Sequence, residues 1–329
     1  MNDADSPSPH LPRLLSLAKG YMPSRIFLTA LELDVFGRLG SERMNASQMA
    51  EQLETDERAT EILLNALAGM ELLQKNDGLF ENKEELAGLL MSGSAHYQGG
   101  GLRHNAHLWE AWSHLTEIVR SGRPHRREWT DDMSRDLASA MKQDAAHMAE
   151  KMTRVLDCSG MKRMLDLGGG PGTYAIAFAR RYPHLHVLVF DRDEHALQAA
   201  RREIQRWHVE DRVGVEKGDF FVEEFGSGYD LVLLSSTVCI LGEKENAVLL
   251  DKINMSLNER GRVVIRDSIL DDSRTKPLSA AIFAVNMLVA TPNGRSYSYS
   301  EVKDLLDRSR FKNIHRVPVE GSQLIVGMK

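Results

Sequence analysis

The sequence predicts an α/β protein in which a mainly helical N-terminal part precedes a sheet domain with a nucleotide-binding turn. Residues 164–173 read M-L-D-L-G-G-G-P-G-T, an apolar run that predicts a buried strand and then breaks into glycines. The pattern resumes as a helix over 174–181. A strand that ends in a glycine turn against a helix N-terminus can hold a nucleotide, so this segment predicts the ligand site.

The three glycines Gly168, Gly170 and Gly172 are spaced G-x-G-x-G. This spacing permits a tight turn and lets a ligand lie directly on the backbone, where a Cβ would collide. The dinucleotide pattern G-x-G-x-x-G would need a further glycine at Thr173, and Pro171 stands inside the turn. The turn therefore differs from that of a dinucleotide-binding protein.

Two further predicted strands end in acidic residues. The strand 186–190 is followed by Asp191, whose carboxylate can accept hydrogen bonds from both hydroxyls of a ribose. The strand 213–216 is followed by Asp219 and Phe220, which can accept from an adenine amino group and pack on its ring. One glycine turn or one such acid can be purely structural, but the three in order predict a nucleoside cofactor.

With these motifs the chain resembles the class I S-adenosylmethionine-dependent methyltransferases, and within them the small-molecule O-methyltransferases that carry an N-terminal dimerisation domain. The motifs are L-D-L-G-G-G-P-G, V-F-D, G-D-F-F, G-R-V-V-I-R-D and T-P-N-G-R-S-Y-S-Y-S-E-V. The resemblance implies a Rossmann-like domain with a mostly parallel seven-stranded sheet. It also implies that the strands 313–319 and 323–328, after a helix at 300–309, form an antiparallel edge hairpin.

The resemblance implies S-adenosyl-L-methionine as the cofactor and no metal ion. Ser235, at the end of the strand 229–235, stands where many relatives place a lysine near the cofactor. The cofactor-binding residues that we expect are Gly168, Gly170, Gly172, Asp191, Arg192, Asp219, Phe220 and Ser235.

The catalytic positions depart from the family pattern. Many relatives use a histidine just after the fourth strand, supported by two acids, and Cys239 stands at that histidine position. Asp267 matches the first acid, whereas the second falls on Ser296. The expected histidine and one acid are therefore missing.

Three interpretations of this departure are open. The acceptor can be an activated phenol or a thiol that needs little help to ionise. Alternatively another residue is the base, and His147, His104 and His107 are the candidates. Finally, Cys239 can be only a buried apolar residue while positioning supplies most of the rate. We favour the last interpretation together with either of the others.

The acceptor is expected between the linker helices and the carboxyl ends of the strands. The segment 95–127 is rich in histidine and tryptophan, and the helix 136–155 that follows faces the acceptor in relatives. His107 and His114 would share a helix face, but a metal site is disfavoured because cysteines and paired carboxylates are missing at ligand spacing. The predicted acceptor-pocket residues are His104, His107, Trp112, Met141, Met148, Asn286 and Met287.

The N-terminal third predicts a winged helix. An amphipathic helix at 25–39 precedes a helix capped near Asn45 and a longer helix capped by Asp56, with Ile62, Leu63, Ala66, Leu67 and Met70 on its apolar face. A hairpin over 74–80 follows, turning at Asp77-Gly78. A DNA-binding regulator is the rival interpretation, but acidic residues outnumber basic ones from 41 to 92. We therefore expect a dimerisation module and a homodimer.

Composition agrees with a soluble cytoplasmic enzyme. The net charge of −6 disfavours nucleic acid as a partner, two cysteines fit a reducing compartment, and no membrane segment or signal peptide is visible. We expect methyl transfer to a small-molecule hydroxyl; S- or C-methylation, or a cofactor-binding regulator without catalysis, are the alternatives. The predicted parts are a disordered tail (1–10), the winged-helix-like dimerisation domain (11–95), the helical linker with acceptor-binding helices (96–157) and the methyltransferase domain (158–329).

Overall fold

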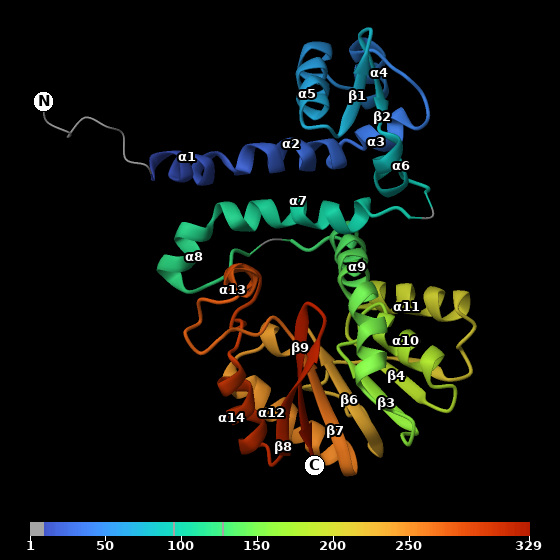
Figure 1. Ribbon diagram of the computed structural model, residues 1–329, viewed down its shortest axis with the longest axis vertical. Helices are drawn as coiled ribbons and strands as arrows, with labels where there is room; N and C mark the ends of the chain where they lie inside the picture. The colour runs from blue at the N-terminus through green and yellow to red at the C-terminus, as the bar shows by residue number, and fades with distance from the viewer. Residues whose placement is uncertain (1–9, 95, 127) are drawn as a thin grey trace, which may run out of the picture. The chain divides into compact units, whose positions relative to one another are not determined.

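The computed structural model describes residues 10–94, 96–126 and 128–329 (Figure 1). The chain divides into two compact units, residues 1–107 and 108–329. Within the described ranges, no helix is both long enough and apolar enough to cross a membrane.

The C-terminal unit is built on a seven-stranded sheet with the order β5-β4-β3-β6-β7-β9-β8. The strands β3 to β7 run parallel, and β9 runs antiparallel to both of its neighbours. This confirms the predicted mostly parallel sheet with its antiparallel edge hairpin. The bounds are β3 Arg163–Leu167, β4 His186–Asp191, β5 Val213–Lys217, β6 Tyr229–Ser235, β7 Leu257–Arg266, β8 Lys312–Val319 and β9 Ser322–Met328.

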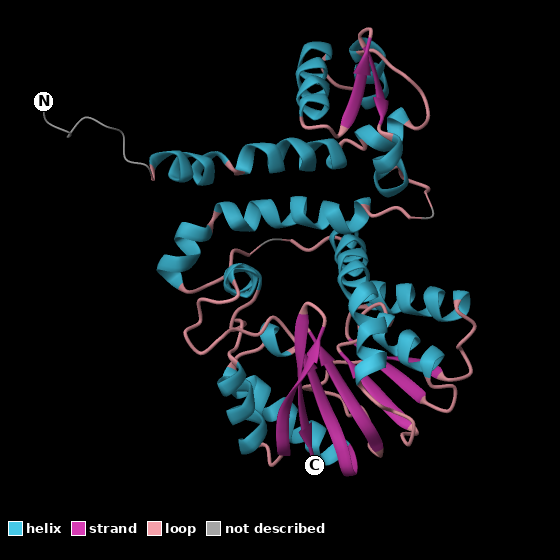
Figure 2. Cartoon of the chain, viewed as in Figure 1, coloured by secondary structure: helices cyan, strands magenta, loops and turns pink. Residues whose placement is uncertain are grey.

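Helices cover both faces of this sheet (Figure 2). The strands are apolar on both sides, as parallel strands buried between helices must be. Met164 of β3 packs in the core shared with α10, whereas its neighbour Leu165 packs in the core shared with α12. The helices are α9 (Asp131–Val155), α10 (Thr173–Arg181) and α11 (Glu194–Arg206) on one face, and α12 (Glu243–Ser256) and α14 (Tyr299–Arg308) on the other.

The carboxyl ends of the five parallel strands meet at one edge of the sheet, where each strand passes into a loop or helix. The short 3-10 helix η2 (Val238–Ile240) follows β6 there, and α13 (Leu278–Ala290) packs against η2. The end of α7 (Gly99–Ser113) and α8 (Leu115–Ser121) also belong to this unit. This edge therefore gathers every segment on which the sequence predicts cofactor chemistry.

The N-terminal unit has the predicted order of helix, helix and hairpin. Asn45 and Gln48 form a capping box at α4, and the Asp56 side chain accepts from the backbone N–H of Ala59 at α5. The hairpin turns at residues 77–78. The elements are α1 (Leu11–Lys19), α2 (Tyr21–Glu32), α3 (Val35–Leu39), α4 (Ala46–Leu53), α5 (Glu57–Gly69), β1 (Leu73–Asn76), β2 (Leu79–Asn82) and α6 (Glu84–Leu90).

Two details of this unit differ from the sequence prediction. The helix expected over 25–39 is two helices, because Asp34 adopts a left-handed conformation (φ 56°) that ends one before the other begins. In α5 the buried residues are Thr60, Leu64 and Leu67, whereas Ile62 is 57 % exposed. Of the predicted apolar face, Leu67 is buried and Leu63, Ala66 and Met70 are half-buried, so the prediction is wrong for Ile62.

Candidate functional site

The glycine turn after β3 has a backbone that only glycine adopts without strain. Gly168, Gly170 and Gly172 have φ values of 71°, 51° and 70°. A Cβ on Gly168 would lie 2.8 Å from Oγ1 of Thr237, and one on Gly170 would lie 2.9 Å from Cε of Met141. The spacing in the sequence thus reflects both the conformation of the turn and the close approach of its neighbours.

Asp166 anchors this turn from inside the sheet. Its side chain is fully buried, and Oδ2 accepts from the backbone N–H of Ala175 at 3.2 Å, in the first turn of α10. Oδ1 has no hydrogen-bond partner among the described residues. Burial raises the pKa of Asp166 to about 7, and the nearby charge of Asp191 adds to the rise.

Asp191 joins the tip of β4 to the glycine turn. Its Oδ2 accepts from the backbone N–H of Gly170 and its Oδ1 from that of Asp193, both at 2.9 Å. Burial raises the pKa of Asp191, and these backbone hydrogen bonds partly oppose the rise. The carboxylate is therefore fixed beside the turn, where a ribose on the glycines would meet it. Arg192, by contrast, is exposed.

The tip of β5 lies next to that of β4, because Gly218 donates its backbone N–H to the carbonyl oxygen of Asp191 at 3.0 Å. Asp219 follows, and its Oδ1 accepts from the backbone N–H of Phe221 at 2.9 Å. Phe220 is half-buried and packs edge-on against Phe221. The three predicted cofactor signals are thus brought to one edge of the sheet in the predicted order.

Cys239 lies in η2 and is only 1 % exposed. Its backbone N–H donates to Oδ2 of Asp267 at 3.1 Å, and Oδ1 of Asp267 accepts from the N–H of Ser268 at 3.0 Å. Burial raises the pKa of the Cys239 thiol well above its usual value, and the adjacent Asp267 raises it further. Burial likewise raises the pKa of Asp267. Together these contacts make Asp267 a support for η2.

The segment 291–297 holds η2 from the other side. Arg295 donates its backbone N–H to the carbonyl oxygen of Cys239 at 2.8 Å, and a Cβ on Gly294 would lie 2.5 Å from the same oxygen. Ser296, which stands at the second acid position, is buried and donates to the carbonyl oxygen of Ala280 at 3.1 Å. In this chain the position thus anchors the start of α13.

Two predicted acceptor residues are in direct contact. Trp112 donates its indole N–H to Oδ1 of Asn286 at 3.0 Å, which joins the end of α7 to α13. Met287 is buried beside Asn286 on α13. Ala111, Ile118 and Val289 form a small apolar cluster next to this hydrogen bond. These contacts connect Trp112 to α13, which itself packs against η2.

The remaining predicted residues are on α7 and α9. Met141 contacts the glycine turn and Met148 is half-buried, whereas His147 is exposed. His104 and His107 are half-buried on the part of α7 that belongs to the N-terminal unit. The proposed roles of the three histidines stay predictions.

Three polar residues that sequence reasoning missed also gather here. Arg266, the last residue of β7, donates from Nη1 to Oδ2 of Asp144 at 2.8 Å. The charge of Arg266 also moderates the raised pKa of Tyr174, in the first turn of α10. The sequence signal for Arg266 is its place at the end of the strand in the motif G-R-V-V-I-R-D, directly before Asp267. The family pattern assigns a role in that motif only to Asp267.

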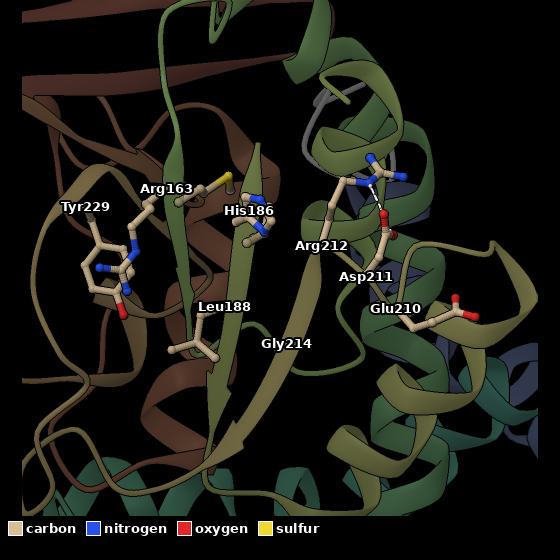
Figure 3. A pocket seen from close by; sticks show the side chains of 10 residues that line it. Arg163, His186, Leu188, Glu210, Asp211, Arg212, Gly214 and Tyr229 are labelled. Atoms are coloured by element: carbon tan, nitrogen blue, oxygen red, sulfur yellow. Dashed lines mark hydrogen bonds and ion pairs between the residues drawn. The ribbon is translucent and has the colours of Figure 1, made fainter. Parts of the chain in front are cut away.

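A separate hollow of about 310 Å³ lies at the opposite, amino ends of the strands (Figure 3). Arg163, His186 and Tyr229 begin their strands at its rim, and Gly214 leaves space on β5. Because open α/β sheets bind ligands at the carboxyl ends of their strands, we do not assign the acceptor to this hollow.

His114, for which a metal site was considered and disfavoured, stacks on His125 with ring centres 3.8 Å apart, and its Nδ1 lies 2.8 Å from Oε2 of Glu117. In the part of the chain that the structure describes, no three histidine, cysteine, aspartate or glutamate side chains are grouped to hold a metal ion.

Comparison with known proteins gives consistent matches. The O-methyltransferase domain family matches residues 112–312, and the O-methyltransferase dimerisation domain matches residues 15–92. The chain is 30% identical to 3-hydroxy-5-methyl-1-naphthoate 3-O-methyltransferase of Streptomyces sahachiroi, over 91% of this chain and 89% of that protein. It is 28% identical to L-tyrosine C(3)-methyltransferase of Streptomyces lavendulae, over 86% and 81%.

A solved structure, PigF with SAH, superposes with a TM-score of 0.89 at 25% identity and covers 97% of this chain and 99% of PigF. The S-adenosylmethionine cofactor that the family resemblance implies is confirmed by these matches, as is the fold. The chain belongs to the family of S-adenosylmethionine-dependent small-molecule O-methyltransferases.

Proposed function

We propose that this enzyme methylates the oxygen of an acidic aromatic hydroxyl, and that positioning and the acidity of the acceptor replace a general base. The observation that carries the proposal is the state of Cys239, which stands at the family's histidine position. It is buried, and its raised pKa keeps it a neutral thiol near pH 7. A protonated thiol cannot take a proton from the acceptor, so this position has lost its usual role.

The glycine turn and the two strand tips fit the cofactor. A Cβ at Gly168 or Gly170 would fill the space against the backbone, and Asp191 is held beside Gly170 by a hydrogen bond. We assign the ribose to Asp191 and the adenine to Asp219 and Phe220. When bound, the cofactor supplies an activated methyl group on a sulfonium, so the protein's task is to align the acceptor oxygen with it.

The wall formed by α13, Trp112 and η2 is the surface that we assign to the acceptor. The hydrogen bond from Trp112 to Asn286 joins the end of α7 to α13. The backbone of Cys239 in η2 is held by hydrogen bonds to Asp267 and Arg295. A rigid wall suits catalysis by positioning, which can supply several kcal/mol of the barrier reduction. Two relatives act on hydroxylated aromatic acids, to judge from their names.

A series of phenols with graded acidity tests the missing base. At pH 7.5 we expect kcat/KM to fall roughly fivefold for each unit by which the phenol pKa rises from about 7 to about 10. An enzyme with its own base would show a much flatter dependence. A flat series together with an essential group that titrates near pH 6.5 would contradict the proposal and return attention to His147, His104 and His107.

Product analysis decides between oxygen and carbon as the methylated atom. One relative is a C-methyltransferase, and ring carbons ortho to an ionised phenol are nucleophilic. NMR of the product from a simple phenol distinguishes the two outcomes. Binding of S-adenosylhomocysteine without turnover of any phenol or thiol would instead favour a regulatory protein.

We also propose a homodimer formed through the N-terminal unit. No residue of α1 is buried, and Leu11, Leu14 and Leu17 are 45 %, 59 % and 70 % exposed. Such an apolar helix needs a partner surface, and residues 15–92 match the dimerisation domain. The double variant Leu14→Glu/Leu17→Glu should be monomeric by light scattering. Val222→Glu, at a 77 % exposed position of the C-terminal unit, is the matched control and should stay dimeric.

We propose the cytoplasm as the compartment. Both cysteines are free and buried, and burial raises the pKa of Cys158 to about 12. A protein without a disulfide framework suits a reducing environment. Fractionation of the host cell with detection of the untagged protein tests this assignment, and recovery outside the cytoplasm would contradict it.

A further inference from the structure

Two buried donors at the carboxyl ends of the strands have no hydrogen-bond partner among the described residues. They are Nε of Arg266 and the hydroxyl of Tyr174. Tyr174 as a whole is 5 % exposed. The Ser235 hydroxyl lies beside that of Tyr174 and tempers the rise in its pKa, but does not complete a hydrogen bond with good geometry. Leaving such groups unpaired costs free energy, so their retention indicates a ligand.

Among the described residues, the hydrogen bonds to the guanidinium of Arg266 are made through Nη1. Its Nη1 donates to Oδ2 of Asp144 at 2.8 Å and to Oγ of Ser236 at 3.2 Å. These contacts come from α9 and from the residue after β6, and they fix the plane of the group. The Nε of the guanidinium has no hydrogen-bond partner among the described residues, so the edge that carries it can donate to a ligand. This edge has the geometry that binds a carboxylate through two parallel N–H donors.

The charges nearby favour an anion. Burial alone would lower the pKa of Arg266, but Tyr174 and Asp144 raise it, so the guanidinium stays charged. Asp144 is the printed ion-pair partner of Arg266, and its side chain is 63% exposed. Water therefore screens the charge of Asp144 more strongly than that of Arg266. The buried end of the guanidinium keeps most of its attraction for a second carboxylate.

The position of Arg266 and Tyr174 relative to the proposed cofactor site follows from the order of the strands in the sheet. Asp191 ends β4, the glycine turn follows β3, Ser235 ends β6, and Arg266 ends β7, in that order across the sheet. Arg266 is the direct strand partner of Ser235. In α9, Met141 touches the glycine turn and Asp144, one turn later, holds Arg266. A ligand that starts on Asp191 and crosses the glycines therefore ends near Arg266.

We infer that Arg266 and Tyr174 form a carboxylate-binding subsite, with Asp144 and Ser236 as the positioning residues. The inference rests on the cofactor orientation proposed above. Two carboxylates can reach this place: that of the cofactor's amino-acid end and that of an acidic acceptor. Both would accept from the free edge of the guanidinium and from the phenol hydroxyl.

Calorimetry with a matched pair of ligands tests the cofactor as the source. S-adenosylhomocysteine carries the amino-acid end, whereas 5′-methylthioadenosine lacks it. If the carboxylate is the cofactor's, Arg266→Met should weaken S-adenosylhomocysteine by about tenfold to a hundredfold and Tyr174→Phe by about threefold to tenfold. Neither variant should change 5′-methylthioadenosine more than twofold. Arg266→Lys should recover only part of the loss, because an ammonium lacks the planar fork.

A second pair of ligands tests the acceptor as the source. With the cofactor site filled by S-adenosylhomocysteine, the probes are 3-hydroxy-2-naphthoate and 2-naphthol. Selective loss of the naphthoate in Arg266→Met, with unchanged S-adenosylhomocysteine affinity, would assign the subsite to the acceptor. Equal weakening of both members of each pair, or no weakening of any ligand, would overturn the subsite.

Asp191→Asn separates this inference from the cofactor assignment, because it should weaken S-adenosylhomocysteine and 5′-methylthioadenosine alike. If it does so while the Arg266 variants have no selective effect on either pair, the cofactor orientation stands and the carboxylate subsite is wrong. Thermal melting of each variant checks that the fold is intact.

Discussion

The part of the site that we assign to the cofactor, at the tips of β3, β4 and β5, is built differently from the part that we assign to the acceptor, formed by η2, α13 and the tip of β7. We call these two parts the cofactor half and the acceptor half. In the cofactor half the site depends on backbone conformation. Three glycines at positive φ form the turn, and the backbone N–H of Gly170 donates to the Asp191 carboxylate. In the acceptor half, the chemistry depends on which side chains are present. A site formed by backbone conformation tolerates few residue types, whereas a site formed by side chains can change its chemistry while the fold stays the same.

Cys239 and Asp267 illustrate this tolerance. The backbone N–H of Cys239 donates to the Asp267 carboxylate, and its carbonyl oxygen accepts from the backbone N–H of Arg295. The loop geometry is therefore supported from both sides with a thiol in place of an imidazole. On the proposed assignments, backbone conformation holds the cofactor, whereas the identity of a side chain decides how the acceptor loses its proton.

The largest effect is expected at Asp166, whose burial raises its pKa from 3.8 to about 7. Because an acid with a raised folded-state pKa binds its proton more tightly when folded, its stabilisation is complete below about pH 4 and is lost as the pH rises toward 7. The variant Asp166→Asn does not ionise, so it does not lose stability in this way as the pH rises. Urea unfolding without cofactor should show the variant more stable than the wild type at pH 8 by at most about 4 kcal/mol.

The same comparison at pH 4.5 should show little gain for Asp166→Asn, since the wild-type carboxyl is then mostly protonated. Asp157→Asn, at an exposed acid whose pKa is lowered by a Ser159 hydrogen bond, is the control and should not gain stability with rising pH. A stability difference for Asp166→Asn that is the same at both pH values would contradict the raised pKa.

A smaller effect is expected at Asp191. Asp191→Ala removes a charged acceptor for the ribose and the hydrogen bond to Gly170, so S-adenosylhomocysteine binding should weaken by roughly 2 to 3 kcal/mol. Calorimetry measures this loss. Arg206→Ala alters an exposed charge at the far end of α11 and should change the affinity less than threefold. Equal losses in the two variants would contradict the assignment of the ribose to Asp191.

The sequence predicted the glycine turn and the acids at the strand ends for the same physical reason, whereas their roles toward the cofactor stay proposals. Positive-φ glycines and acids at strand tips are local requirements, so they are visible along the chain. The mostly parallel seven-stranded sheet and its edge hairpin were implied by the resemblance to the family rather than by a local pattern. By contrast, the hydrogen bond from Trp112 to Asn286 and the ion pair from Asp144 to Arg266 join residues far apart in sequence. No local pattern specifies such pairs, and Arg266 and Tyr174 were accordingly missed.

The hydrogen bond from Trp112 to Asn286 offers a test confined to the acceptor half. Asn286→Ala leaves the indole N–H without its acceptor, which should cost about 1 kcal/mol of acceptor binding and raise KM about fivefold. The affinity for S-adenosylhomocysteine should stay within twofold. Asn258→Ala, at a hydrogen bond near the amino ends of the strands, is the matched control. A loss of cofactor affinity in Asn286→Ala would show that the two halves are not independent.

The smallest effect is expected at Cys239, where a catalytic residue would give a large one. Cys239→Ala removes a buried thiol but keeps the backbone N–H that Asp267 holds, so the rate should fall less than tenfold, a barrier change below roughly 1.4 kcal/mol. General-base catalysis is typically worth a hundredfold or more, so a fall of that size with intact cofactor binding would make the thiol a participant. His147→Ala, His104→Ala and His107→Ala, measured one at a time, test the three candidate histidines by the same criterion. If no variant loses a hundredfold, the proton is released by the acceptor itself, and the acceptor half works by holding an already ionised oxygen in line with the methyl group.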